Sequence, residues 1–266
     1  MLSPMQRHRA KVQTLNEMQP SDAVSSTSTS LHLLNAALKK DVQYLRSLPT
    51  IQERIEEKRN VLLPRWQPYA QSYIDQGANY RNPILSYCIV WLFDVGEFDL
   101  AIKWAFIAIE QNQSTPDNIK SYFPAFVADQ VYSWAEQQAE QGNSIEPYFS
   151  MIFNKVANEW RIHEEIKSKW YKFAGLFVLR DNDDKPRATA IEDLEVLEKA
   201  DQLLAQSEAL YKHAQVKTIR ASIAARIRAL TDSDYTASQR PQEEKRDFLN
   251  HLSNLGRALF LRGKHV

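Results

Sequence analysis

The sequence predicts an all-α protein built from helical hairpins. Only six of its 266 residues are glycine, while helix-forming residues such as Ala, Leu, Gln, Glu and Lys dominate. Every long apolar segment repeats at the spacing of a helix, and none alternates as a strand does. We therefore expect helical hairpins packed as a tetratricopeptide-like array, with an N-terminal helical hairpin before it and a C-terminal amphipathic helix after it.

The core of this array is predicted around residues 62–111. This stretch contains Trp66, Tyr87, Trp91 and Trp104, which are large enough to anchor a hydrophobic core. Gly96 divides it into two apolar helices because glycine permits the backbone of a tight turn. Similar turns are expected at Gly142 and at residues 180–184.

Charge and composition limit the function classes. The chain has 33 basic and 33 acidic residues, so contact with nucleic acid has to come from local patches. Cys88 is the one cysteine, which excludes a disulfide within a monomer and fits a reducing compartment. The apolar runs are too short to span a membrane, and the polar, basic N-terminus is unlike a secretory signal.

Four regions follow from the pattern along the chain. Residues 1–30 form a flexible basic arm and linker, 31–61 an N-terminal helical hairpin and possible oligomerisation element, 62–230 the helical-repeat core, and 231–266 a linker and docking helix. The arm is either a phosphate-binding segment or a frayed terminus. Its basic residues are Arg7, His8, Arg9 and Lys11.

The stretch 211–230 is predicted as a basic amphipathic helix, with an apolar stripe from Val216 to Leu230. It carries no acidic residue, so it could meet phosphate, an acidic partner or water alone. Its candidate DNA-binding residues are Lys212, Lys217, Arg220 and Arg228.

The last segment places apolar side chains on one helical face after a polar linker. This pattern is typical of a docking peptide, although the helix could also fold back on its own domain. The candidate partner-binding residues are Phe248, Leu252, Leu255 and Leu259.

No catalytic arrangement is readable, and no cofactor is expected. Asp181, Asp183 and Asp184 are followed by Lys185 and Pro186, which breaks the pattern of a calcium loop. A magnesium nuclease needs converging carboxylates, and no such set has a suitable spacing. The sequence therefore leaves enzyme activity open and assigns no catalytic or metal-binding residue.

Short motifs that keep their order resemble the phage small terminase subunit family. They are Ser3-Pro4, Gln6-Arg7-His8, Leu62-Leu63-Pro64 with Trp66 and Pro68, Trp91-Leu92 with Asp94 and Gly96, Gly175-Leu176-Phe177, and Ala209-Leu210 with Val216-Lys217.

This resemblance implies a component that binds phage DNA at the packaging site in the host cytoplasm. The implied partners are double-stranded phage DNA, a large ATPase and nuclease subunit, indirectly the portal, and further copies of the chain. Members are often described as the terminase endonuclease subunit, but we expect cutting to require the assembled enzyme. The long Lys/Arg/Pro-rich tail of many members is replaced here by a linker and an amphipathic helix. The alternative function is a tetratricopeptide-like adaptor that binds protein and not DNA.

Overall fold

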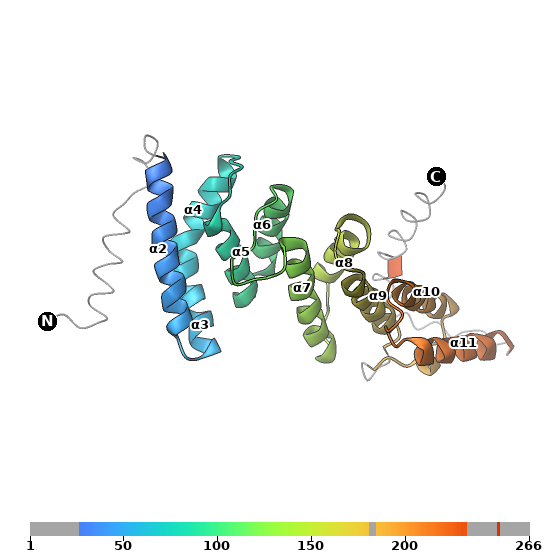
Figure 1. Ribbon diagram of the computed structural model, residues 1–266. Coiled ribbons are helices and arrows are strands. Elements are labelled where there is room, and N and C mark those ends of the chain that lie inside the picture. The colour runs from blue at the N-terminus through green and yellow to red at the C-terminus, as the bar shows by residue number, and fades with distance from the viewer. Residues whose placement is uncertain (1–26, 181–184, 233–248, 251–266) are drawn as a thin grey trace, which may run out of the picture. The chain divides into compact units, whose positions relative to one another are not determined.

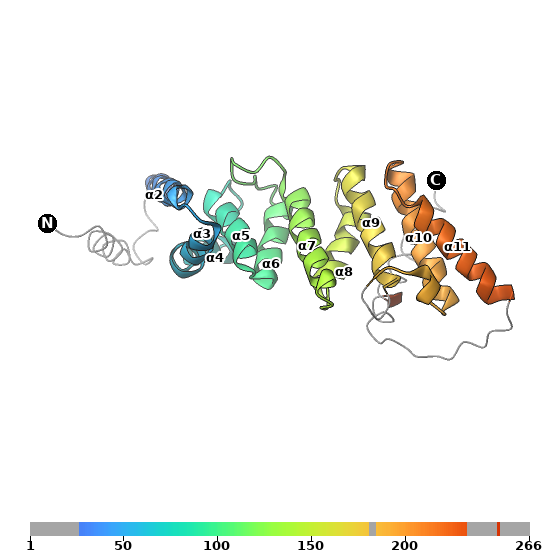
Figure 2. The ribbon, with the colours of Figure 1, turned by 90° about the horizontal axis from the view of Figure 1, so that it is seen from below.

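The computed structural model describes residues 27–180, 185–232 and 249–250 (Figures 1 and 2). The chain divides into two compact units after Glu97. All regular elements within these residues are helical, and they contain no strand beyond an isolated bridge between Arg180 and Pro186. The predicted all-α class is confirmed. The tetratricopeptide-like packing and the four predicted regions stay predictions.

The first unit consists of two helical rods followed by one more helix. Helix α2 ends two residues before Pro49, and Thr50 then starts the next rod with a capping box: Thr50 Oγ1 accepts from the Glu53 amide at 3.1 Å, and Glu53 Oε2 accepts from the Thr50 amide at 3.3 Å. The second rod runs without interruption from residue 51 to 75 because a π-helical turn joins its two α-helical parts. The elements are α2 (Thr27–Ser47), α3 (Ile51–Glu57), η2 (Lys58–Leu62), α4 (Leu63–Asp75) and α5 (Pro83–Val95).

A polar contact between α2 and α4 explains why α2 carries an acid between two core leucines. Leu38 and Leu45 are buried, and Asp41 between them accepts hydrogen bonds from Arg65 Nη1 at 2.6 Å and Trp66 Nε1 at 3.0 Å. The carboxylate is therefore paired inside the first unit rather than left without a partner beside apolar side chains.

The π-helical turn also fixes the end of α5. Lys58 Nζ lies 2.7 Å from Asp94 Oδ2, and Arg59 Nη2 donates to the Val95 carbonyl at 2.9 Å. Gly96 then adopts a left-handed backbone with φ 86°, which is the predicted turn residue in the role that glycine fills best.

The second unit carries the remaining helices. Gly142, with φ 72°, follows α7 as predicted, and residues 181–184 of the third expected turn lie outside the described residues. The elements are α6 (Phe98–Glu110), α7 (Phe123–Glu140), α8 (Tyr148–Asn154), η3 (Lys155–Glu159), α9 (Glu164–Val178), η4 (Ala188–Ala190), α10 (Leu194–Leu210) and α11 (Lys217–Asp232).

Stacked aromatic rings form the core of this unit. The fully buried Trp170 stacks on Phe149, with ring centroids 4.9 Å apart, and Phe153 continues the stack. Helices α9 and α10 pack closely because Ser168 and Ser207 exchange hydrogen bonds, each hydroxyl donating to the other residue's carbonyl at 2.8 and 2.9 Å. Helix α10 of this pair is the one against which α11 packs.

Candidate nucleic-acid interface

Helix α11 begins later than the sequence predicts. Residues 211–216 form a turn, with Gln215 in the left-handed region at φ 58°, and the helix starts only at Lys217. The predicted helix over 211–230 is therefore wrong in its first six residues. Helix α10 ends where Tyr211 becomes extended, with φ −145° and ψ 108°, so Lys212 lies in the turn and not on a helical face.

The apolar stripe of α11 faces the body of the unit. Val216, Ile223 and Leu230 are buried, and the helix packs on α10 and η4. The opposite side is consequently presented to solvent. Burial of this stripe confirms the amphipathic pattern of residues 217–230.

Arg220 is held by two carboxylates of α10. Its Nε and Nη2 bond the two oxygens of Asp201 at 2.8 and 3.2 Å, and its Nη1 bonds Glu208 Oε2 at 2.8 Å. The hydrogen bonds to Asp201, followed by those to Glu208, raise the pKa of Arg220 above its ordinary value. This predicted DNA-binding residue therefore orients α11, and its charge is balanced in the structure.

The solvent side of α11 has a cation near each end and short side chains between them. We call this surface the outer face; Lys217 and Arg228 bracket it, and both are exposed. The 11 residues that separate them (228 − 217) correspond to about 16 Å along a helix with a rise of about 1.5 Å per residue. The exposed side chains between them include Thr218, Ala221, Ser222, Ala224 and Ala225.

A lysine that the sequence analysis missed lies beside the turn before α11. Lys172 of α9 donates from Nζ to the Ala214 carbonyl at 2.8 Å, two residues from the exposed Lys212. Nothing in the local sequence around Lys172 could have identified it, because the contact joins residues 42 positions apart. The structure thus brings Lys172 to the same end of α11 as Lys212 and Lys217.

Four cations of this region have no ion-pair partner among the described side chains. Within the described ranges, Lys172, Lys212, Lys217 and Arg228 have no salt bridge, and the chain from Tyr211 to Thr231 contains no acid. Lys212, Lys217 and Arg228 are exposed, and exposed cations next to short polar and apolar side chains are suited to binding phosphate beside a nucleic-acid groove.

The other predicted site residues lie outside the described part of the chain. This holds for the basic residues of the arm and for the apolar residues of the C-terminal segment: Arg7, His8, Arg9, Lys11, Phe248, Leu252, Leu255 and Leu259.

The described residues offer no group of three His, Cys, Asp or Glu side chains that could hold a metal ion. None of the helices described is long and apolar enough to cross a membrane.

Comparison with known proteins identifies the class of this helical protein as a phage protein of the terminase type. The model of the phage small terminase subunit family matches residues 35–165. A probable terminase endonuclease subunit of Haemophilus phage HP1 is 39% identical over 242 residues, which cover 89% of this chain and 86% of the relative. The terminase endonuclease subunit of Escherichia phage P2 is 25% identical over 190 residues, or 71% of this chain and 76% of the relative. No solved structure matches significantly.

The chain therefore belongs to the phage small terminase subunit family. The resemblance found in the short sequence motifs is confirmed, and the chain has the role of a small subunit of phage terminase.

Proposed function

We propose that this terminase subunit binds double-stranded phage DNA at the packaging site and delivers it to the large ATPase and nuclease subunit. Cohesive-end cleavage and packaging of the genome into the capsid would follow. The observation that carries the proposal is the outer face of α11, where exposed cations bracket short side chains and no acid intervenes.

The dimensions of this face suit the DNA major groove. The groove is about 12 Å wide and admits an α-helix. With Lys217 and Arg228 near opposite ends of an exposed helix, their long side chains can reach phosphates on the two walls of the groove. The short side chains between them let the helix backbone come close to the base edges.

The side chains of the outer face can make two kinds of contact: phosphate contacts, which position the helix on DNA, and contacts with base edges. Lys217, Arg228 and the neighbouring Lys212 supply the phosphate contacts that fix orientation. Thr218 and Ser222 carry hydroxyls that can hydrogen-bond to base edges, and the exposed alanine methyls can contact the methyl group of thymine. The arm with Arg7, His8, Arg9 and Lys11 adds phosphate contacts in the proposal.

The proposed assembly has more than one subunit. One outer face offers few phosphate contacts, so several copies bound to the same DNA would gain affinity through multivalency. The large subunit is placed at the C-terminal segment that contains Phe248 and Leu252, and contact with the portal is indirect through that subunit. The complex would act in the host bacterial cytoplasm.

The names of both relatives include an endonuclease activity. We place DNA cutting in the assembled enzyme, since the sequence of this chain shows no converging set of carboxylates suited to magnesium-dependent cleavage. The small subunit then contributes recognition and presentation of the DNA.

The test compares two double variants of equal charge change. Lys217→Ala/Arg228→Ala removes the cations of the outer face, and Lys39→Ala/Lys40→Ala removes two exposed cations of α2 in the first unit. Binding to a duplex that contains the packaging site is followed by fluorescence anisotropy over a salt series, and light scattering checks the oligomeric state.

We expect the first variant to lower the slope of log affinity against log salt by about two per bound subunit, because each lost phosphate contact removes about one. The control variant should keep the wild-type slope. Equal slopes in both variants would place DNA binding elsewhere. Failure of the unaltered protein to bind duplex would favour the protein-only adaptor.

A further inference from the structure

Helix α7 presents a stripe of acidic and short side chains to solvent. We call it the α7 stripe; its residues follow one another at intervals of four, three and four and are all exposed: Asp129, Ser133, Glu136 and Glu140. These intervals place them on one side of the helix. Burial raises the pKa of Asp129, and the charge of the nearby Lys169 lowers it by less. Helix α7 has no lysine or arginine, and in the part of the chain that the structure describes the acids of the stripe form no salt bridge.

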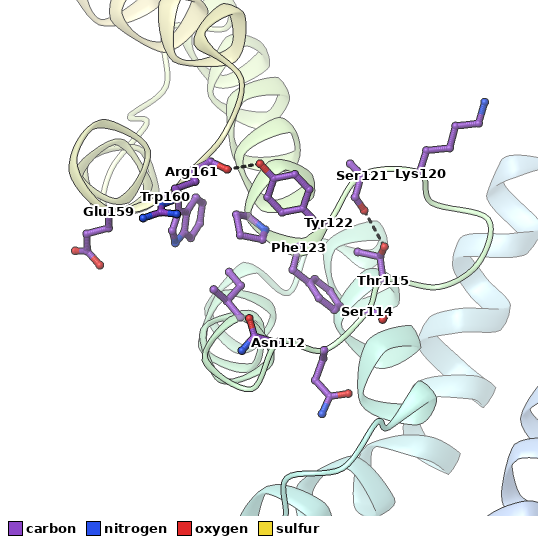
Figure 3. A pocket seen from close by; sticks show the side chains of 13 residues that line it. Asn112, Ser114, Thr115, Lys120, Ser121, Tyr122, Phe123, Glu159, Trp160 and Arg161 are labelled. Carbon is purple, nitrogen blue, oxygen red and sulfur yellow. Dashed lines mark hydrogen bonds between the residues drawn. The ribbon is translucent and has the colours of Figure 1, made fainter.

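Both ends of α7 are anchored, so the stripe belongs to a fixed helix. Near the N-terminal end, the Tyr122 hydroxyl donates to the Arg161 carbonyl. Figure 3 shows this bond at the edge of a pocket of about 610 Å³ that Tyr122 helps to line. Near the C-terminal end, the Arg180 side chain donates to the Ala139 carbonyl. A preformed surface loses less entropy when a partner binds to it.

The outer face of α11 repeats the spacing of the α7 stripe with the opposite charge. Exposed residues follow one another there at the same intervals of four, three and four: Lys217, Ala221, Ala224 and Arg228. In each helix the first and last of these residues carry a charge and are 11 positions apart (228 − 217 and 140 − 129), which corresponds to about 16 Å. The alanines between the cations let another helix approach closely.

The two matching surfaces cannot meet within one copy of the chain. Figures 1 and 2 both show α9 and α10 between α7 and α11, and α9 packs directly on α10. The stripe and the outer face each point away from the buried side of their helix. A partner that carries the matching acids at the matching spacing is a second copy.

Helix dipoles favour an antiparallel arrangement of the two helices. Lys217 begins α11 and Glu140 ends α7, so each lies at the end of its own helix where the dipole disfavours its charge. Antiparallel pairing brings these two residues together and relieves both. It also places Arg228 beside Asp129 at the other end of the contact.

We propose that the outer face of α11 in one copy packs antiparallel on the α7 stripe of a second copy. Lys217 and Arg228 are also the cations that we propose to contact DNA, so a neighbouring subunit and a duplex compete for them. This competition rests on the proposed function, whereas the pairing of the helices does not. A contact between two different surfaces leaves one of each free, so further copies can add until the assembly closes.

The first experiment joins the two helices covalently in the full-length protein. Ser133→Cys/Ala224→Cys introduces thiols at positions that face each other in the antiparallel arrangement, and the native Cys88 is buried. Mild oxidation should link copies into covalent dimers and longer chains on a non-reducing gel. Ser133→Cys alone and Ala224→Cys alone are the matched controls, because each provides only one of the two facing thiols.

Charge reversal in the double-cysteine protein tests the ion pairs. Asp129→Lys/Glu140→Lys should lower the yield of cross-linked product about tenfold at a fixed protein concentration, because two exposed ion pairs become like-charge contacts. Adding Lys217→Glu/Arg228→Glu to the same chain should restore the yield, since the two charge patterns are then exchanged.

A second pair of cations serves as the control for charge reversal. Lys103 and Arg161 are exposed in the second unit and belong to neither surface, so Lys103→Glu/Arg161→Glu should leave the cross-link unchanged. Circular dichroism melting checks that each variant is folded.

The proposal is overturned if the folded double-cysteine protein cross-links no more than the single-cysteine controls, or if the exchanged charges do not restore the yield. An excess of packaging-site duplex should suppress the cross-link if the duplex occupies the outer face. A cross-link that forms and is insensitive to duplex supports the pairing and contradicts DNA binding at this face. The two proposals can therefore fail separately.

Discussion

Arg220 on α11 forms a two-point contact with Asp201 on α10, Nε to Oδ1 at 2.8 Å and Nη2 to Oδ2 at 3.2 Å. Glu208, two helical turns further along α10, accepts from the remaining side of the same guanidinium. One arginine thus spans two acids on a neighbouring helix. The contact ties α11 to α10, while Lys217 three residues earlier stays exposed.

Arg220→Ala should weaken the attachment of α11 to α10. It should not change the salt dependence of DNA binding, because Arg220 is not expected to contact phosphate. The three side chains are 26–35% exposed, so solvent screening limits the expected loss in unfolding free energy to about 1 kcal/mol. Urea unfolding measures that loss, and Lys217→Ala is the control with unchanged stability. If the variant kept its stability but lowered the slope of log DNA affinity against log salt by one, Arg220 would contact phosphate directly.

Gly175→Ala should destabilise the second unit. A Cβ atom at this position would lie 2.8 Å from Leu204 Cγ and 3.2 Å from the Ala200 carbonyl oxygen, and such overpacking costs about 1–3 kcal/mol. Leu204→Ala makes space for the new methyl group. The double variant should therefore be more stable than the sum of the two single losses predicts, as a double-mutant cycle in urea would show. Strict additivity would mean that the backbones of α9 and α10 move apart instead.

Trp104→Ala should reduce stability and leave DNA recognition chemistry unchanged. Trp104 is 2% exposed in α6, and truncation of a large buried aromatic side chain costs about 3–5 kcal/mol. Trp134→Ala is the matched control, since Trp134 is only partly buried and packs against Phe98 and Tyr148. Thermal melting should rank the two variants in that order. A Trp104 variant with a normal melting temperature and no activity would identify Trp104 as a functional residue.

Deletion of residues 242–266 should leave folding and DNA binding intact but weaken capture of the large subunit. The expectation rests on the apolar stripe of Phe248, Leu252, Leu255 and Leu259 after a polar linker. Leu252→Ala/Leu255→Ala in the full-length chain should reproduce the loss of capture in a pull-down with the large subunit. Undiminished capture, or unfolding of the shortened protein, would each contradict a docking role.

The purified subunit alone should not cut packaging-site DNA in the presence of Mg²⁺. Cleavage of this kind requires carboxylates that converge on the metal, and the sequence offers no such set. A plasmid that carries the site is incubated with the subunit alone and with the reconstituted enzyme, and only the second reaction should yield cut product. Specific nicking by a preparation shown to be free of large subunit and host nucleases would overturn this expectation.

Local sequence patterns predicted the helices and turns well where one residue type determines the backbone. Gly96 and Gly142 both adopt positive φ, and glycine is the residue that does so without strain. The start of α11 was missed because neither glycine nor proline marks the break between Leu210 and Lys217. The apolar spacing also continues through Val216, which is buried although it precedes the helix.

The candidate sites depend on contacts that sequence spacing does not contain. Arg220 has the spacing of an exposed cation. Its pairing with Asp201 depends on the packing of α11 against α10, which the sequence spacing does not contain. The contact of Lys172 with Ala214 joins separate helical segments. The hydrogen bond from the Tyr122 hydroxyl to the Arg161 carbonyl joins residues 39 positions apart, so no local motif could have indicated it.

The π-helical turn over Lys58–Leu62 makes the second rod tolerant of a change in length. In this turn the Leu63 amide reaches back five residues to the Lys58 carbonyl, so the turn holds one residue more than an α-helical turn does. Loss of a single residue here would restore an ordinary α-helical turn, and Trp66 would still face Asp41. Loss of a residue within α4 ahead of Tyr73 would instead rotate everything after it by about 100° and turn Tyr73 out of the core. The π-helical turn is therefore the place where this rod can lose one residue without changing which of its sides is buried.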